Sequence, residues 1–330
     1  MAIITKGLPR VSVVTLHWNA GDVTLAALRN ILDWDYPQEL LDVVVHDNAS
    51  FDGSSEPLAA EVAVLAGRGL AVSYVRSAQH PGPTQAFNRA VALTRSDARY
   101  ILRFDNDGWL DSNALSILVR YLEDHADVGS VGARVVIAGH PELHNGAAIW
   151  FTALGNTRIE HHERPVVCDT FLPAALLVRR EIVSGLGRMF DPELYLFYEE
   201  PEFHWQITKL GFNNVWHPDA IAYNHAGTST GKTPDLCLYL NARNSAIVLT
   251  QILPWPMAQL RNLIQFVRLL GRWFIMAESV RLRGCVDGML RRPLNHEWWN
   301  QNMQSNGIFI PLQSQVAKCP EKLNKNESCT

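Results

Sequence analysis

Two carboxylates, Asp105 and Asp107, flank Asn106 directly after an apolar run that is typical of a buried strand. Ionised carboxylates at the end of such a strand cost free energy unless a cation or hydrogen-bond donors compensate them. Mg²⁺ and Mn²⁺ prefer oxygen ligands and commonly complete their coordination with the phosphates of a substrate. The pair therefore indicates a divalent metal site, and a solvated turn that caps the strand is the alternative interpretation.

A second acidic strand end lies earlier in the chain. Asp47 closes the apolar run 41–48, and a polar turn follows it before the next helix. A carboxylate at such a position can accept a hydrogen bond from an N–H group of a planar base, and Trp18, which ends the first strand, can offer its face to that base. An Asx-type turn beside a packed tryptophan is the alternative.

The elements that must position these residues follow from hydrophobic periodicity. Continuous β-branched and apolar runs predict strands, and helical spacing between them predicts helices, in the order strand 11–18, strand 41–48, strand 69–75, helix 83–94 and strand 99–105. This alternation predicts an α/β fold with a mostly parallel, Rossmann-like sheet covered by helices on both faces. Such sheets bind ligands at the carboxyl ends of their strands, so Asp47 and Asp105 are expected on one edge.

Composition limits the class of protein further. The 330 residues are 47% hydrophobic, which suffices for a large core, and the net charge of −4 gives no basic field for nucleic acid. The five cysteines have no C-x-x-C spacing, which favours free thiols in a reducing compartment and argues against zinc. The N-terminus has no secretory pattern, so we expect a cytoplasmic location.

The segment 257–284 has apolar residues along one helical face and arginines along another. It either packs on the catalytic unit or brings residues 257–292 to the anionic inner face of the cell membrane as a peripheral anchor. A spanning helix is not expected, because the longest charge-free stretch nearby, residues 244–260, is short and contains Pro254 and Pro256.

Taken together, the stretches "VSVVTLHWNAGD", "VVVHDNASFDGS", "RFDNDGWL" and "LYLFYEEPEFHWQ" resemble family-2 glycosyltransferases with the GT-A fold, in particular bacterial rhamnosyltransferase-like members. The resemblance covers about residues 10–250. It implies a hexosyl- or deoxyhexosyl-transferase of polysaccharide biosynthesis. Such an enzyme moves a sugar from a nucleotide diphosphate donor to a hydroxyl of a glycan or lipid-linked acceptor, with inversion at the anomeric carbon.

The resemblance also implies roles for individual residues. Asp47 matches the aspartate that binds the base, Trp18 the aromatic residue that stacks on it, and Asn88 an asparagine that contacts the donor. Asp105 and Asp107 match the D-x-D motif, which contacts the donor and holds Mg²⁺ or Mn²⁺.

Two further residues complete this implied site. Glu200, in "EEPEF", falls on the catalytic base, although the family usually has aspartate at that position. The segment "AYNHAGTS" keeps only one of two histidines that are frequent in the family. That histidine, His225, is implied as a third metal ligand. Attack on the face opposite the diphosphate then needs only one carboxylate base and a stabilised leaving group.

The predicted domain organisation follows from these assignments. A catalytic domain is expected over 1–230, with a nucleotide-sugar half over about 10–107 and an acceptor half over about 108–230. An amphipathic helical region over 231–298 and a disordered tail over 299–330 follow. Two other functions stay open at this stage: a metal-dependent nucleotidyltransferase or phosphohydrolase, and a non-catalytic protein that binds sugar nucleotides.

Overall fold

The structure, a computed structural model, describes residues 7–138, 140–144, 147–172, 174–224, 234–276 and 279–294. All of them belong to one compact unit, Met1–Leu294. The predicted tail over 299–330 lies outside the described residues.

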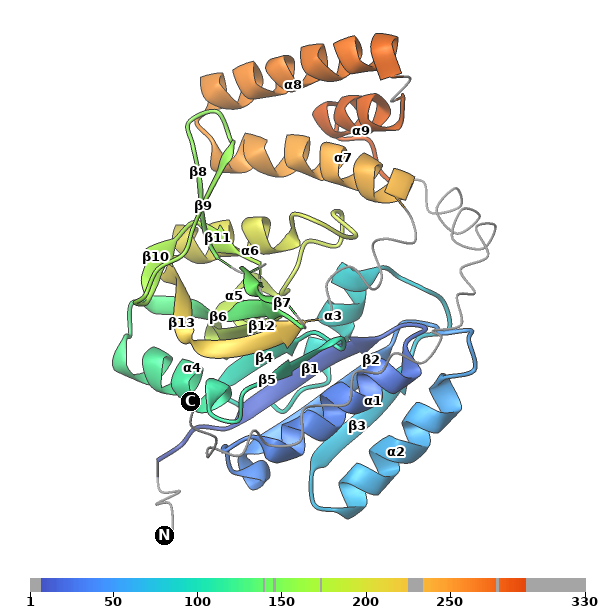
Figure 1. Cartoon of the computed structure of the whole chain (residues 1–330), viewed down its shortest axis with the longest axis vertical. Helices are drawn as coiled ribbons and strands as arrows, with labels where there is room; N and C mark the ends of the chain where they lie inside the picture. The colour runs from blue at the N-terminus through green and yellow to red at the C-terminus, as the bar shows by residue number, and fades with distance from the viewer. Residues whose placement is uncertain are drawn as a thin grey trace, which may run out of the picture. The chain divides into compact units, whose positions relative to one another are not determined.

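A sheet forms the centre of this unit, with the strand order β10-β13-β6-β12-β4-β1-β2-β3 (Figure 1). Its N-terminal half is parallel and consists of β1 (Val11–His17), β2 (Leu41–Asp47), β3 (Ala71–Arg76) and β4 (Tyr100–Phe104). These four strands match the predicted ones within about two residues. Strands β1, β2 and β4 are almost wholly buried, as expected for continuous apolar runs covered on both faces.

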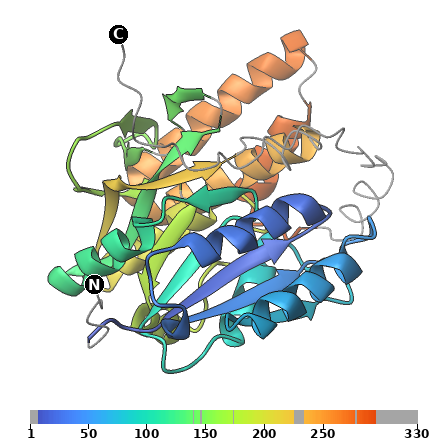
Figure 2. The ribbon, with the colours of Figure 1, turned by 60° about the horizontal axis from the view of Figure 1, so that its bottom comes forward.

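Helices cover both faces of the sheet (Figure 2). Side chains of α1 (Gly21–Asn30), α2 (Ser55–Gly67) and α4 (Ala114–Asp124) share one hydrophobic cluster with Val13 and Val43. Side chains of α3 (Pro83–Ala92), α5 (Arg180–Leu186) and α6 (Glu199–Lys209) share the other with Val14 and Val44. Neighbouring residues of one strand thus face opposite layers, as strand geometry requires. The predicted layered α/β architecture is confirmed.

The C-terminal half of the sheet is mixed. Strand β12 (Ala175–Arg179) runs antiparallel to β4 and to β6 (Val128–Ile137), and β13 (Asn213–Asn224) runs parallel to β6. Strands β5 (Gly108–Leu110) and β10 (Val166–Cys168) pair with β13, and β7 (His140–His144) pairs with β6. A small separate sheet contains β8 (Ala148–Phe151), β9 (Thr157–Glu160) and β11 (Thr170–Phe171).

Three helices end the described chain: α7 (Pro234–Ile252), α8 (Trp255–Met276) and α9 (Ser279–Met289). The sequence pattern predicts one helix over 257–284, whereas the structure has two. The second packs closely on α7 because Gly284 and Gly288 face its backbone, where an added Cβ would lie 2.4 Å from the carbonyl oxygen of Tyr239 and 2.3 Å from that of Arg243. None of the described helices is both long and apolar enough to cross a bilayer.

Candidate active site

The carboxyl ends of β1, β2 and β4 meet at one edge of the sheet. His17 at the end of β1 pairs in register with Asp47 at the end of β2, and Asp105 directly follows β4. The predicted convergence of Asp47 and Asp105 on one edge therefore follows from the observed strand order. Asn106, between the two aspartates, donates a 2.9 Å hydrogen bond to the hydroxyl of Thr24 on α1, which ties the acidic turn to that helix.

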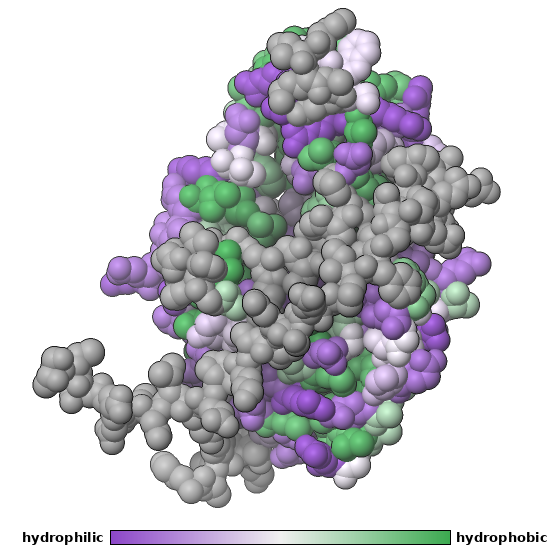
Figure 3. Space-filling model, turned by 45° about the vertical axis from the view of Figure 1, so that its right-hand side comes forward, coloured by the Kyte–Doolittle hydropathy of each residue, from purple (hydrophilic) through white to green (hydrophobic). Residues whose placement is uncertain are grey.

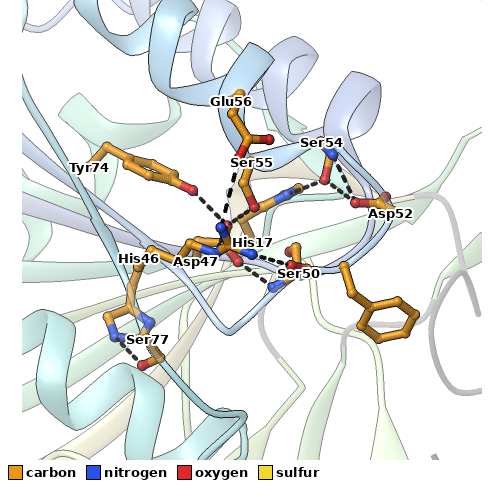
Figure 4. A network of polar contacts seen from close by, with 12 residues as sticks. His17, His46, Asp47, Ser50, Asp52, Ser54, Ser55, Glu56, Tyr74 and Ser77 are labelled. Atoms are coloured by element: carbon orange, nitrogen blue, oxygen red, sulfur yellow. Dashed lines mark hydrogen bonds and ion pairs between the residues drawn. The ribbon is translucent and has the colours of Figure 1, made fainter. Parts of the chain in front are cut away.

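Asp47 is fully buried and is the centre of a polar network (Figure 4). One carboxylate oxygen accepts from the backbone N–H of Ser50 at 2.8 Å. The other accepts from the hydroxyls of Ser55 at 2.5 Å and Tyr74 at 2.6 Å, and Arg76 lies 3.7 Å away. Burial raises the pKa of Asp47, but these hydrogen bonds outweigh it and leave the pKa below its usual value. The carboxylate is therefore ionised and held in a fixed orientation.

The contacts among His17, Ser54 and Asp52, seen in Figure 4, fix the adjoining turn. The ring of His17 bridges the hydroxyl of Thr24 at 2.9 Å and that of Ser54 at 2.8 Å, and Ser54 in turn bonds to Asp52. Burial lowers the pKa of His17 against the opposing effect of Asp47, which keeps the imidazole neutral at physiological pH. The loop after β2 is thus built around neutral hydrogen bonds and one buried carboxylate.

Aromatic rings line the same edge. Trp18 contacts the ring of His80 edge-on, with centroids 5.1 Å apart, and Phe51 at 6.3 Å. His80 lies 3.1 Å from the amide of Asn48 and 3.0 Å from the hydroxyl of Tyr195. Burial lowers the pKa of His80 to about 4, so it is a neutral link between the β2 loop and the segment that precedes α6.

Two amide atoms at this edge are buried without a hydrogen-bond partner among the described residues: the Nδ2 of Asn19 and the Oδ1 of Asn48. A buried polar atom without a partner costs about 1–3 kcal/mol, so such atoms normally bind water or a ligand. One donor and one acceptor next to Trp18 are suited to a planar polar ligand.

The turn that contains Asp105 is joined to the start of α6 by a largely buried arginine. Arg103, in β4, contacts Asp105 at 2.9 Å with one guanidinium nitrogen and Glu200 at 3.2 Å with another. Its guanidinium also lies 5.2 Å from the ring centre of Phe87 and 6.0 Å from that of Phe190. The two acidic motifs, almost one hundred residues apart in sequence, therefore form a single site.

Electrostatics in this site are strongly coupled. Burial raises the pKa of Asp105 to about 7; Arg103 opposes this shift, and Asp107 and Glu200 add to it. Burial also raises the pKa of Glu199 to about 8, with Glu200 as the next contribution. The pKa of Arg103 is raised because these carboxylates outweigh its burial. A site with more acids than cations is prepared to receive further positive charge.

The three acids at the start of α6 differ in their partners. Glu202 accepts from Arg188 at 2.8 Å and from Gln206 at 2.8 Å, so its carboxylate is engaged in the fold. Glu199 is buried, and its Oε2 has no partner among the described residues. Glu200 contacts Arg103 at 3.2 Å, next to Asp105.

The remaining predicted residues have different placements. Asn88 uses its amide for the backbone of the loop before α6: it donates to Phe190 O at 2.7 Å and accepts from the N–H groups of Met189 and Phe190. A donor contact by Asn88 stays a prediction. Asp107 lies close enough to Arg103 and Asp105 to affect the pKa of both. His225 lies outside the described residues.

The described residues contain no group of three His, Cys, Asp or Glu side chains placed to hold a metal ion. The donor set nonetheless fits Mg²⁺ or Mn²⁺, because Asp105 and Asp107 supply hard oxygen ligands in a negatively charged site and such ions commonly use one or two carboxylates together with substrate phosphates. Asp105, one oxygen of which pairs with Arg103, and Asp107 are the residues that would hold the ion.

Arg103, His80 and Tyr195 were missed in the sequence. The signal for Arg103 is a single charge in the otherwise apolar strand "YILRF", which a buried strand accepts only with a partner. His80 and Tyr195 carry no local signal, since each is defined by contacts with distant segments.

Comparisons with known proteins agree with this architecture. The computed structure is similar to the mannosyltransferase PcManGT from Pyrobaculum calidifontis, solved with GDP-Man and Mn²⁺, with a TM-score of 0.58 and 17% identity over 87% of this chain and 89% of that one. It is also similar to TarS from S. aureus in complex with UDP-GlcNAc, with a TM-score of 0.54 and 15% identity over 81% of this chain and 73% of that one. The fold is therefore the GT-A fold of glycosyltransferases, as predicted.

The sequence model of "Glycosyl transferase family 2" matches residues 12–187. The chain belongs to glycosyl transferase family 2. It is also 31% identical over 100 residues to an N-acetylglucosaminyl-diphospho-decaprenol L-rhamnosyltransferase of Mycobacterium tuberculosis. That match covers 30% of this chain and 32% of the relative, so the chain spans about a third of the length of this curated relative.

Proposed function

We propose that this protein transfers a sugar, with inversion, from a nucleotide diphosphate donor to a hydroxyl of a glycan or lipid-linked acceptor. The observation that carries the proposal is the contact of Arg103 with both Asp105 and Glu200. This contact joins Asp105, a proposed metal ligand on the donor side, to Glu200 at the start of α6. Inverting transfer needs one group that stabilises the leaving diphosphate and one carboxylate base, and this pair is proposed to supply both.

The donor lies, in this proposal, at the edge formed by β1 and β2. Trp18 offers an aromatic face, and the unpartnered amide atoms of Asn19 and Asn48 offer a donor and an acceptor to the base. Asp47 is fully buried and engaged by Ser50, Ser55 and Tyr74, so its main contribution in this proposal is to hold the loop beside the base in shape.

Glu200 is the proposed general base. It accepts the proton of the acceptor hydroxyl while that oxygen attacks the anomeric carbon, and the bond to the diphosphate breaks on the opposite face. Arg103 contacts the Glu200 carboxylate at 3.2 Å and thereby fixes its orientation. A divalent ion held by Asp105 and Asp107 supplies charge compensation for the leaving diphosphate when it is bound.

The acceptor is proposed to be lipid-linked, because the M. tuberculosis relative is named for a diphospho-decaprenol substrate. The exposed face of α8 supports this proposal. Leu260, Leu263 and Val267 lie along one side of the helix and are exposed, the last two by 56% each, and Trp255 at its start is 75% exposed. These three residues of the predicted apolar face are exposed, whereas Ala258 and Leu269 of the same helix are buried.

Charge on α8 matches an anionic surface. The helix contains no Asp or Glu, and Arg268 and Arg272 are exposed beside the apolar face. Figure 3 shows hydrophobic and hydrophilic side chains next to one another at the upper end of the molecule, where Figure 1 places α8. Apolar burial in the headgroup region, together with about 1 kcal/mol per basic residue near anionic lipid, favours peripheral association at a membrane.

The transfer is tested with a panel of UDP-, GDP- and TDP-linked sugars and with glycan and polyprenyl-diphosphate acceptors, with products followed by mass spectrometry. Glu200→Gln is expected to lower turnover about 10²-fold or more and to leave binding of the nucleoside diphosphate unchanged. Glu202→Gln is the matched control and should retain most activity. If the protein hydrolyses the donor to the same extent with and without every acceptor, it is a hydrolase. Binding of the donor without turnover would indicate a binding protein.

Membrane association is tested by flotation with vesicles that contain phosphatidylglycerol. The wild type should float at low salt, and the double variant Leu263→Glu/Val267→Glu should remain in the soluble fraction. Leu93→Glu is the control, because Leu93 is an apolar residue of similar exposure, 53%, that lies directly after α3. Equal flotation of all three proteins would refute a role for α8.

A further inference from the structure

The segment Asp191–Tyr198, which leads directly into α6, has a strained backbone. Tyr195, Phe197 and Tyr198 have positive φ angles of 63°, 69° and 68°, a region that residues other than glycine adopt rarely. The N–H of Leu196 bonds to the carbonyl of Leu194 across Tyr195 at 2.8 Å, which closes a very tight turn. Such strain persists only where surrounding structure holds it in place.

Two neighbouring residues of α7 provide that support. The side-chain amide nitrogen of Asn244 lies 2.6 Å from Leu194 O, 2.8 Å from Leu196 O and 2.9 Å from Phe197 O. Its N–H groups are thus shared among three converging carbonyls of the turn. Arg243 donates to Glu193 O at 3.1 Å and contacts the Glu193 carboxylate at 3.3 Å. Both side chains are completely buried.

The support continues into α9 and into the hydrophobic packing. Arg243 also donates to Arg292 O at 3.0 Å, and Arg292 pairs with Asp287 of α9 at 3.1 Å. On the apolar side, Leu194 packs against Ile247 and Val248 of α7. The turn is therefore held by the C-terminal helices through both polar and apolar contacts.

The position of Glu200 depends on the conformation of this turn. Tyr198 is the N-cap residue of α6, and Glu200 is the second residue of that helix. The contact of Glu200 with Arg103 is therefore set by the conformation of the three residues before Glu199. A displacement of about 1 Å in a catalytic group can cost about 10²-fold in rate, so a support for this turn has consequences for turnover.

We infer that Asn244, assisted by Arg243, is a positioning residue that holds the turn 194–198 and thereby aligns Glu200 for proton abstraction. The helical region after the catalytic sheet is then part of the catalytic apparatus rather than an independent attachment. This inference rests on the proposed function, because it acts through Glu200.

The test compares Asn244→Ala with Asn262→Ala. Asn262 is a buried asparagine of α8 whose amide donates to Ala246 O of α7 at 3.4 Å and accepts from Arg261 at 2.9 Å. Asn244→Ala is expected to lower kcat about 10- to 100-fold, with the dissociation constant for the nucleoside diphosphate changed by less than about threefold. Asn262→Ala should lose a similar amount of thermal stability and keep kcat.

A double variant separates positioning from general loss of stability. If Asn244 acts through Glu200, Asn244→Ala should change the residual rate of Glu200→Gln by less than about twofold, because the group that it positions no longer accepts a proton. Wild-type kcat in Asn244→Ala, or an equal loss in both backgrounds, would overturn the inference. Should Asn244→Ala not fold, Asn244→Ser and Asn262→Ser are compared by the same criteria.

The two proposals fail in different ways. Full turnover of Glu200→Gln would refute Glu200 as the base whatever Asn244 does. Loss of turnover in Glu200→Gln together with unchanged kcat in Asn244→Ala would leave the proposed function intact and refute the positioning role alone.

Discussion

Replacement of Asp47 by alanine should destabilise the protein far more than replacement of an exposed aspartate. Three short hydrogen bonds, from Ser50, Ser55 and Tyr74, end on the buried carboxylate. At about 1.5–3 kcal/mol for a bond to a charged group, their simple sum is about 4.5–9 kcal/mol. The two hydroxyls can reorient toward other acceptors, whereas the backbone N–H of Ser50 stays buried. We therefore expect a loss of about 3–5 kcal/mol in the free energy of unfolding.

Urea unfolding followed by circular dichroism measures this loss, with the m-value as the check that the same transition is observed. Asp97→Ala is the control, since Asp97 is exposed and its ion pairs with Arg10 and Arg95 are of the surface type, worth about 0–1 kcal/mol. Asp47→Asn should lose less than Asp47→Ala, because its amide oxygen still accepts from Ser50. A loss below about 1 kcal/mol for Asp47→Ala would show that the network does not hold the β2 loop.

Three further predictions follow from the same contacts. The stability difference between wild type and Asp47→Ala should be constant near neutral pH and should shrink as the pH falls below about 4. The reason is that the lowered pKa of Asp47 in the folded state contributes stability that is lost when the carboxylate is protonated. Unfolding midpoints measured against pH check this. Arg103→Met should cost about 3 kcal/mol in unfolding free energy, since it leaves the largely buried Asp105 and Glu200 carboxylates without this cation, and thermal unfolding measures it. Gly82→Ala should be destabilising and should lower turnover, because its Cβ would lie 2.6 Å from the ring of Tyr195 at a φ of 93°. Gly211→Ala, with a φ of 88° and open space around it, should lose only about 1 kcal/mol of unfolding free energy through backbone strain.

The parallel half of the fold could be predicted because its physics is local. A strand buried on both faces must be a continuous apolar run, and β1, β2 and β4 are such runs. An aspartate that follows such a run must lie at the strand end, so the common edge for Asp47 and Asp105 needs only the parallel order of the strands.

Contacts across long separations could not be predicted in this way. The charge of Arg103 is visible in the sequence, but nothing local indicates that it reaches Glu200 as well as Asp105. The direction of the apolar face of α8 was equally hidden, because a helical pattern shows which residues share a face and leaves open whether that face meets the core or the solvent. In the structure, Leu263 and Val267 are exposed, whereas Leu269 of the same helix is buried.

The acidic segment before α6 shows most clearly why a catalytic assignment needs three dimensions. In sequence, Glu199, Glu200 and Glu202 are equivalent acids at a helix start, where the helix dipole favours each of them. Their partners separate them: Glu202 is bonded to Arg188, whereas Glu200 contacts the arginine that also holds Asp105. That separation exists because residues at the turn before the helix adopt positive φ angles, which no sequence pattern of "LYLFY" indicates and which contacts from α7 maintain. In the proposed mechanism, the position of Glu200 thus depends on the C-terminal helices as well as on the motif that contains it.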